Sequence, residues 1–358
     1  MKPLAIRQIL LQNFKNYQQR KFEFSASHTL IIGKNGIGKT NLLDAIHFLS
    51  LTKSAFHNDK QLILQNETFC RVESIWQENE TLHKLTAIYA PPERKRFILN
   101  DYTFSTLAEY IGRFPVVIIA PNDTDLILEG SEERRRFVDT ILCQIDKNYL
   151  QALSKYNHLL KQRNAVLMQF PLPKSAQSLI EVYDEQLLPT IQQLATQRQN
   201  FIATLQPLLQ KNYAELSQSS KNARISYKTN CLQTDFKQIF HQSWQKDIAL
   251  QRTSQGIHKD DFEFFLNENA IKKFGSQGEQ KTFIIALKLA VFEFLQEKLQ
   301  ITPLLLLDDI LDKLDETRTF QLLQKVMQKP FGQVFLTEAN PKRLDQIPAV
   351  KEWQKIEI

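Results

Sequence analysis

The chain contains one segment, residues 28–51, that joins three recognisable patterns and reads HTLIIGKNGIGKTNLLDAIHFLSL. Its first five residues form a short apolar run that predicts a buried strand. Its last eleven residues place apolar side chains at helical spacing. Between them, residues 33–40 match G-x-x-x-x-G-K-[ST], a pattern that binds nucleoside triphosphates when it lies between a strand and a helix. We therefore predict a phosphate-binding loop at this position.

Each residue type in this loop has a separate chemical role. Glycines let the backbone curl so that its N–H groups face phosphate oxygens, and the start of the following helix favours negative charge. Lys39 is predicted to contact the β- and γ-phosphates of ATP and to act in catalysis, and the Thr40 hydroxyl is predicted to bind Mg²⁺. The predicted nucleotide-binding residues here are Gly33, Lys34, Asn35, Gly36, Ile37, Gly38, Lys39, Thr40 and Asn41.

A second metal ligand is expected at the end of a neighbouring strand. Residues 303–309 read PLLLLDD, in which four leucines predict a buried strand that ends at an acid pair. Open α/β sheets bind ligands at the carboxyl ends of their strands. We therefore predict that Asp308 binds Mg²⁺ and that the catalytic Asp309 orients or deprotonates the attacking water.

Composition limits the class of protein. The chain has 358 residues, 42% of them hydrophobic, and a formal charge of +6, which is typical of a folded protein and permits a nucleic-acid partner. There is no long apolar stretch or secretory leader, so we expect a cytoplasmic protein without membrane contact. Only nine residues are glycine, and none occurs in the 125 positions between Gly130 and Gly256.

That glycine-free region predicts a helical insertion. Its apolar spacing is helical, and Pro171, Pro173, Pro189 and Pro207 are expected to divide it into several helices. Alternating residues 69–89 and 95–102 predict antiparallel strands, and residues 333–337 predict a last parallel strand. The expected fold is an α/β P-loop ATPase head with an antiparallel β subdomain. We predict head residues 1–130 and 243–358 around a helical lobe at 131–242.

The second glycine cluster resembles the signature motif of ATP-binding-cassette ATPases. It reads FGSQGEQ at residues 274–280 and precedes a strongly apolar helix. The resemblance implies that Ser276, Gly278 and Gln280 bind the γ-phosphate of ATP held by a second subunit, so that ATP joins a homodimer. Asp312, just after the acid pair, resembles the D-loop that crosses such an interface.

The chain as a whole resembles the RecF family of SMC/ABC-type ATPases. The resemblance rests on LQNFKNY at 11–17, EERRRFVD at 132–139, LLKQRN at 159–164, GIHKDD at 256–261 and FGSQGEQKT at 274–282. Three residues depart from the family pattern: Asn122, Ile257 and Glu279. They put in doubt how strongly the protein hydrolyses ATP, but not that it binds a nucleotide. The 237 positions between Lys39 and Ser276 also exceed the corresponding gap of a transporter cassette.

This resemblance implies a role in DNA replication, recombinational repair and the SOS response. The protein would dimerise with ATP and Mg²⁺ on single-stranded and duplex DNA, at their junctions. It would hydrolyse ATP slowly as a switch and help to load recombinase with RecO and RecR. The alternatives are a transporter cassette subunit and a nuclease-associated ATPase.

Two features stay open at this level. The run Arg134-Arg135-Arg136 is either a phosphate-contacting patch or a salt-bridged helix start beside acidic residues. Lys15 and Asn16 either reach the nucleotide or form a turn.

Overall fold

The computed structural model describes residues 2–169, 176–311, 316–328, 331–340 and 348–358. It divides into two compact units, each treated by itself below. The first unit consists of residues 1–124, 211–220 and 277–358, and the second of residues 125–210 and 221–276. Among the helices in the described ranges, none has both the length and the apolar character to cross a membrane.

The first unit contains a five-stranded parallel sheet with the strand order β14-β3-β13-β12-β8. Its strands are β3 (His28–Ile32), β8 (Val116–Ile119), β12 (Leu304–Leu307), β13 (Val334–Glu338) and β14 (Gln354–Glu357). The predicted strands at 303–307 and 333–337 are confirmed within one residue. The expectation that the second of these is the last strand was wrong, because the half-exposed β14 pairs with β3 at the edge of the sheet.

An antiparallel sheet of six strands forms the other layer of this unit, in the order β2-β1-β4-β5-β6-β7. Its strands are β1 (Leu4–Phe14), β2 (Tyr17–Glu23), β4 (Cys70–Glu78), β5 (Thr81–Tyr89), β6 (Arg96–Leu99) and β7 (Tyr102–Thr103). Strands β1 and β2 form a hairpin whose register ends at the pair Phe14 and Tyr17. The tight turn between them therefore consists of only Lys15 and Asn16.

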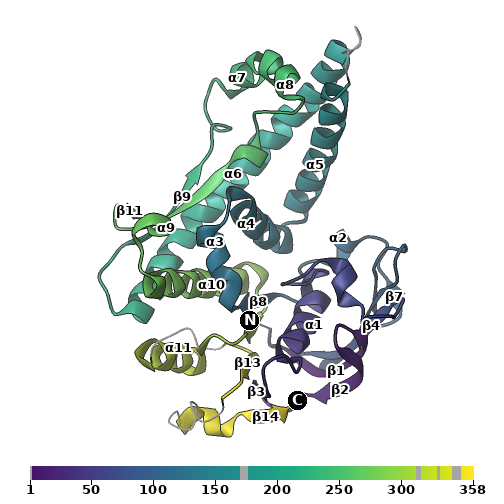
Figure 1. Ribbon diagram of the computed structural model, residues 1–358, viewed down its shortest axis with the longest axis vertical. Helices are drawn as coiled ribbons and strands as arrows, with labels where there is room; N and C mark the ends of the chain where they lie inside the picture. The colour runs from purple at the N-terminus through teal and green to yellow at the C-terminus, as the bar shows by residue number, and fades with distance from the viewer. Residues whose placement is uncertain (1, 170–175, 312–315, 329–330, 341–347) are drawn as a thin grey trace. The chain divides into compact units, whose positions relative to one another are not determined.

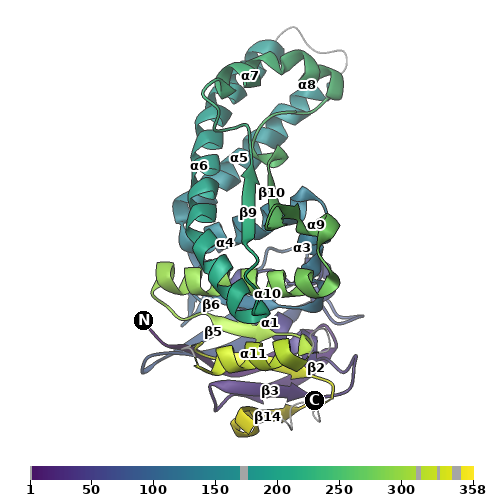
Figure 2. The same cartoon turned by 90° about the vertical axis from the view of Figure 1, so that its left-hand side faces the viewer.

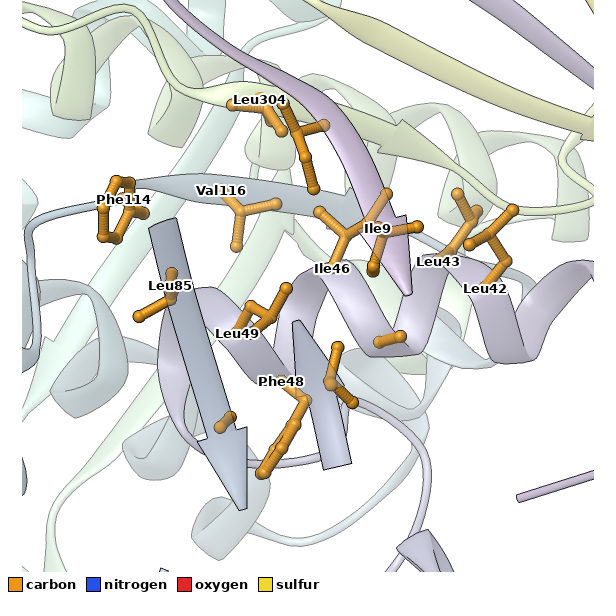
Figure 3. Packing of buried hydrophobic residues seen from close by; sticks show 14 of the residues in the cluster. Ile9, Leu42, Leu43, Ile46, Phe48, Leu49, Leu85, Phe114, Val116 and Leu304 are labelled. Atoms are coloured by element: carbon orange, nitrogen blue, oxygen red, sulfur yellow. The ribbon is translucent and has the colours of Figure 1, made fainter. Parts of the chain in front are cut away.

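Helix α1 (Lys39–Leu51) lies in the core of the first unit, where ten of its thirteen residues are buried and most of the buried ones are apolar. Figure 3 shows its Leu42, Ile46 and Leu49 beside residues of both sheets, including Ile9 and Leu304. The other helices of this unit are α2 (Leu107–Tyr110), α10 (Gln277–Leu299) and α11 (Glu316–Gln328), with short 3₁₀ turns at Asp59–Leu62, Pro121–Thr124 and Pro348–Glu352. Helix α10 packs on β8.

The second unit is mostly helical. Its helices are α3 (Asp125–Leu128), α4 (Ser131–Ile145), α5 (Lys147–Leu167), most of α6 (Ala176–Ser217), α7 (Phe236–Gln242), α8 (Trp244–Leu250) and α9 (Ile271–Phe274). A small antiparallel sheet has the order β11-β10-β9, formed by β9 (Ala223–Lys228), β10 (Asp261–Leu266) and β11 (Asn269–Ala270). Figure 2 shows β9 along α6, where the Gln206 side chain bonds both Ala223 and Ile225.

Buried ion pairs join the long helices of the second unit. Arg163 of α5 is fully buried and pairs with Asp184 of α6 at 2.6 Å and with Asp247 of α8 at 2.8 Å. Arg198 of α6 pairs in the same way with Asp139 of α4 at 2.9 Å. Because buried charges need partners, these contacts fix which faces of the helices meet.

The predicted fold class is confirmed, but one expectation about the insertion was wrong. Pro189 and Pro207 do not end helices; both lie inside the 42-residue α6. Proline removes one backbone donor and weakens a helix locally, yet buried side chains anchor α6 before Pro189, at Leu187, and after Pro207, at Leu209. Pro171 and Pro173 lie outside the described residues.

The compact units do not coincide with the predicted segments, because residues 211–220 belong to the first unit, whereas residues 125–130 and 243–276 belong to the helical unit and not to the head. For residues 243–276 the reason is strand pairing: β10 pairs along its whole length with β9.

Candidate nucleotide-binding site

The predicted phosphate-binding loop connects β3 to α1, as the sequence pattern required. Helix α1 begins at Lys39, and the preceding Gly38 has φ 126°, a conformation that side-chain-bearing residues rarely adopt. Lys39 is 6% exposed, and its ammonium donates to the carbonyl oxygens of Gly33 at 2.7 Å and Lys34 at 3.1 Å. The side-chain oxygen of Asn35 lies 3.5 Å from it. The loop therefore curls around its own lysine.

The hairpin turn between β1 and β2 holds this loop from outside. Asn16 Nδ2 donates to the carbonyl oxygen of Ile37 at 2.8 Å, and the Tyr17 hydroxyl donates to that of Gly38 at 3.0 Å. A Cβ on Gly38 would lie 2.7 Å from the Tyr17 hydroxyl oxygen, so the close approach itself requires glycine. Burial raises the pKa of Tyr17 to about 12, so its hydroxyl stays a donor at neutral pH.

Lys15 and Asn16 thus have structural partners that the sequence alone left open. Lys15 forms a buried ion pair of 2.5 Å with Asp44 of α1. The side-chain oxygen of Asn16 accepts a hydrogen bond of 2.7 Å from Asn41, which lies at the start of the same helix. The turn therefore connects the antiparallel sheet to the loop and to the first helical turn.

The predicted metal ligands meet although they are 268 positions apart. The Thr40 hydroxyl lies 3.0 Å from both carboxylate oxygens of Asp308. Thr337, at the end of β13, donates a second hydrogen bond of 2.8 Å to Asp308 Oδ1. Asp308 is 4% exposed, and this burial raises its pKa. A buried carboxylate beside a threonine hydroxyl is an oxygen donor set that suits Mg²⁺, because the cation would offset the cost of desolvating the charge.

Asp309 follows directly and has an unusual backbone. Its φ is 45°, and its N–H donates to the Thr337 hydroxyl at 2.9 Å. Its Oδ1 atom is buried and has no hydrogen-bond partner in the described structure. An unpartnered buried carboxylate oxygen at this edge of the sheet is available to accept a hydrogen bond from a bound molecule.

A third acid, Glu338, was not predicted. It ends β13, the strand between β3 and β12, and is fully buried. Its Oε1 atom accepts a hydrogen bond of 2.8 Å from the Asn340 backbone, whereas Oε2 is buried and has no hydrogen-bond partner in the described structure. Burial raises its pKa, the nearby Asp309 raises it further, and Lys39 opposes the shift. Its place just after an apolar parallel strand was the signal that could have revealed it.

The signature residues lie at the start of α10 and before it. Gly278 approaches α11 so closely that a Cβ there would lie 2.6 Å from Nη1 of Arg318. Ser276 is exposed and Gln280 is half-buried. Ser276 belongs to the second unit, whereas Gly278 and Gln280 belong to the first. Asp312 lies outside the described residues.

The three consecutive arginines of α4 have different partners. Arg134 is buried and pairs with Asp261 at 2.7 Å. Arg136 pairs with Glu132 and Glu133 on its own helix, as a salt-bridged helix start predicts. Arg135 instead donates to Ser131 and to a backbone carbonyl oxygen.

Comparisons with known proteins show which family the chain resembles. Residues 5–352 match the family model described as RecF/RecN/SMC N terminal domain. The DNA replication and repair protein RecF of Cytophaga hutchinsonii is 43% identical over 342 residues, which cover 95% of this chain and 90% of that protein.

Two solved structures also resemble the chain along nearly its whole length. The recombination mediator protein RecF with ATPrS has a TM-score of 0.89 at 28% identity, covering 99% of this chain and 96% of that one. RecF with ATP has a TM-score of 0.88 at 29% identity, covering 94% and 92%. Both are described as part of the RecFOR pathway. These matches favour the replication and repair interpretation over the transporter and nuclease-associated alternatives.

Proposed function

Because the chain belongs to the RecF family of DNA replication and repair proteins, we propose that it is an ATP-switched DNA-binding protein of replication and recombinational repair. The observation that carries this proposal is the contact of Thr40 with Asp308 at 3.0 Å beside the Lys39 loop. Segments far apart in the chain are brought together there into the donor set that a metal-bound nucleoside triphosphate needs.

Each residue of this site then has a defined task. The loop N–H groups and Lys39 bind the phosphates, and Thr40 and Asp308 would hold Mg²⁺, which neutralises phosphate charge when bound. Asp309 would orient the attacking water and accept its proton, a role that its buried and unpartnered Oδ1 atom supports. Asn16 and Tyr17 hold the loop in place before ATP binds. Binding therefore loses little conformational entropy from the loop.

The second half of the switch is dimerisation. Ser276, Gly278 and Gln280 would close over the γ-phosphate of ATP bound to a second copy, and Asp312 would approach across the same interface. Such a dimer assembles on DNA where single strand meets duplex, and slow hydrolysis releases it. RecO and RecR are the proposed partners, since the related RecF structures are described within the RecFOR pathway.

Sedimentation with and without ATP and a gapped DNA duplex tests this function. Wild-type protein should dimerise only with both, and Lys39→Ala should abolish the ATP-driven step because the phosphates lose their cation. Lys60→Ala, which removes an exposed lysine of the same unit, is the matched control and should behave as wild type. ATP-driven dimerisation by Lys39→Ala would refute the switch.

Asp309→Asn separates binding from hydrolysis. It should retain ATP binding and produce a dimer that stays on DNA much longer than the wild-type dimer. Dissociation at the wild-type rate would show that Asp309 does not activate water.

A further inference from the structure

The second unit carries four cationic side chains that the nucleotide site does not use. They are Arg135 of α4, Lys246 of α8, Arg252 just after α8, and Lys259 at the end of the 3₁₀ turn Ile257–Lys259, and we call them the basic cluster. Lys246, Arg252 and Lys259 are exposed and Arg135 is half-buried. The four positive charges come from three separate parts of the chain.

Hydrogen bonds fix the positions from which these side chains extend. Arg135 Nη1 donates to the carbonyl oxygen of Asp260 at 2.7 Å, directly next to Lys259. The Arg252 N–H donates to the carbonyl oxygen of Asp247 at 3.1 Å, which ties the segment after α8 back to that helix. The basic cluster thus rests on ordered backbone and not on a free loop.

The His258 ring also holds the backbone next to Lys259 in place. Its Nδ1 atom lies 2.5 Å from the Tyr156 hydroxyl oxygen, and its Nε2 atom lies 3.0 Å from the Thr253 carbonyl oxygen. Its pKa is lowered to about 4, chiefly by burial, so the ring is neutral at pH 7 and adds no charge to the cluster.

The charges of the basic cluster have no acidic partner in the part of the chain that the structure describes. Among the described residues, no carboxylate lies within 4.0 Å of any of its four cationic groups. Neighbouring arginines differ: Arg134 pairs with Asp261, and Arg136 pairs with two glutamates of α4. The nearby Asp247 carboxylate is occupied by Arg163.

The positive charges of the cluster are close enough to affect the pKa of one of its members. The pKa of Lys259 is lowered, first by partial desolvation and then by the charges of Arg252, Arg135 and Lys246, with Asp247 opposing the shift. Holding like charges together costs free energy, which a bound polyanion would recover.

We propose that the basic cluster binds the sugar-phosphate backbone of DNA. This inference rests on the proposed function and adds to it the residues that contact DNA. The cluster consists of lysine and arginine, which bind phosphate oxygens, so the contact is expected to be independent of base sequence. Of the arginine run in α4, only Arg135 takes part, because Arg134 and Arg136 are already paired.

The test compares two double variants of the full-length protein on a fluorescently labelled gapped duplex. Arg252→Gln/Lys259→Gln removes two exposed charges of the basic cluster. Lys21→Gln/Lys84→Gln removes two exposed lysines of the first unit that already lie beside Glu23 and Glu73, so the net charge changes equally. Anisotropy titrations across a salt series measure the affinity and its salt dependence.

The Arg252→Gln/Lys259→Gln variant should bind roughly tenfold more weakly, because two charge-assisted contacts are lost. The slope of log affinity against log salt should fall in magnitude by about 2, since each phosphate contact on duplex DNA contributes about 0.9. The control variant should keep wild-type affinity and slope. Arg252→Lys/Lys259→Arg, which retains both charges, should also bind as wild type.

Several outcomes would overturn the proposal. Unchanged affinity and slope in Arg252→Gln/Lys259→Gln would show that the basic cluster serves another partner, such as an acidic protein surface, while leaving the proposed function intact. Failure of wild-type protein to bind the duplex at all would refute both. If the first variant melts at a lower temperature than wild type, Lys246→Gln/Lys259→Gln repeats the test. Binding of DNA by this second, stably folded variant with wild-type affinity would refute the proposed role of the basic cluster.

Discussion

Substitution of Tyr17 by phenylalanine removes one oxygen atom from the support of the phosphate-binding loop. The hydroxyl donates to the Gly38 carbonyl oxygen at 3.0 Å and is buried, whereas the ring packs edge-on against Phe22 with centroids 5.8 Å apart. Tyr17→Phe keeps the ring contact and deletes only the hydrogen bond. The loop residue that loses this bond lies immediately before Lys39.

The structure limits the size of the effect. The Gly38 carbonyl oxygen also accepts the N–H of Leu42 at 3.0 Å, so it stays hydrogen-bonded in the variant. The cost is then that of one ordinary buried hydrogen bond, about 1 kcal/mol, and not the larger penalty of an unsatisfied group. About 1 kcal/mol corresponds to roughly a fivefold weaker affinity for ATP if the bond holds the loop in its binding conformation.

Equilibrium titration with a fluorescent ATP analogue measures this change, and thermal unfolding measures global stability in parallel. Tyr102→Phe is the matched control, because that tyrosine is 60% exposed on β7 and its ring likewise packs edge-on against a phenylalanine. A Kd within twofold of wild type, with a lower melting temperature, would refute the reasoning. The hydroxyl would then stabilise the fold without positioning the loop.

Three further predictions concern buried ionisable side chains. Arg163→Met leaves Asp184 and Asp247 as buried acids without their arginine. Urea denaturation should show that the free energy of unfolding falls by about 3–5 kcal/mol, and a decrease below about 1 kcal/mol would contradict this prediction. Because the pKa of His258 is lowered to about 4, wild-type stability should be complete above pH 6.5 and decrease by up to about 3 kcal/mol as the pH falls to 4. His258→Gln should lack this decrease, and an identical pH profile would show that another group is responsible. Because burial raises the pKa of Glu338, Glu338→Gln should melt at a higher temperature than nucleotide-free wild type at pH 8. The difference in melting temperature should vanish as the pH falls to about 4.5, because wild-type Glu338 is then protonated. A difference that stays constant with pH would contradict this prediction.

Local patterns were sufficient for much of the fold. The loop at residues 33–40, its flanking strand and helix, and the acid pair after β12 are each specified within a few consecutive residues, so the sequence predicts them directly. Helix α10 was predicted for the same reason. Proline was a poorer guide, because Pro189 and Pro207 lie in a helix held by buried contacts on both sides.

The composition of the site was decided by tertiary structure. Thr40 and Asp308 meet because β13 pairs with both β3 and β12, so that three strands end at one edge of the sheet. The same register buries Glu338 between them, although its only local signal was its place at the end of an apolar strand.

The sequence by itself therefore determined the family, the phosphate-binding loop and the acid pair, since these depend on short runs of chain. Only the tertiary structure decided that Tyr17 holds the loop, that Glu338 is a third acid, and that Arg135 alone of its run lacks an acidic partner among the described residues. Those properties depend on which side chains from distant segments meet, and hence on strand register and helix packing.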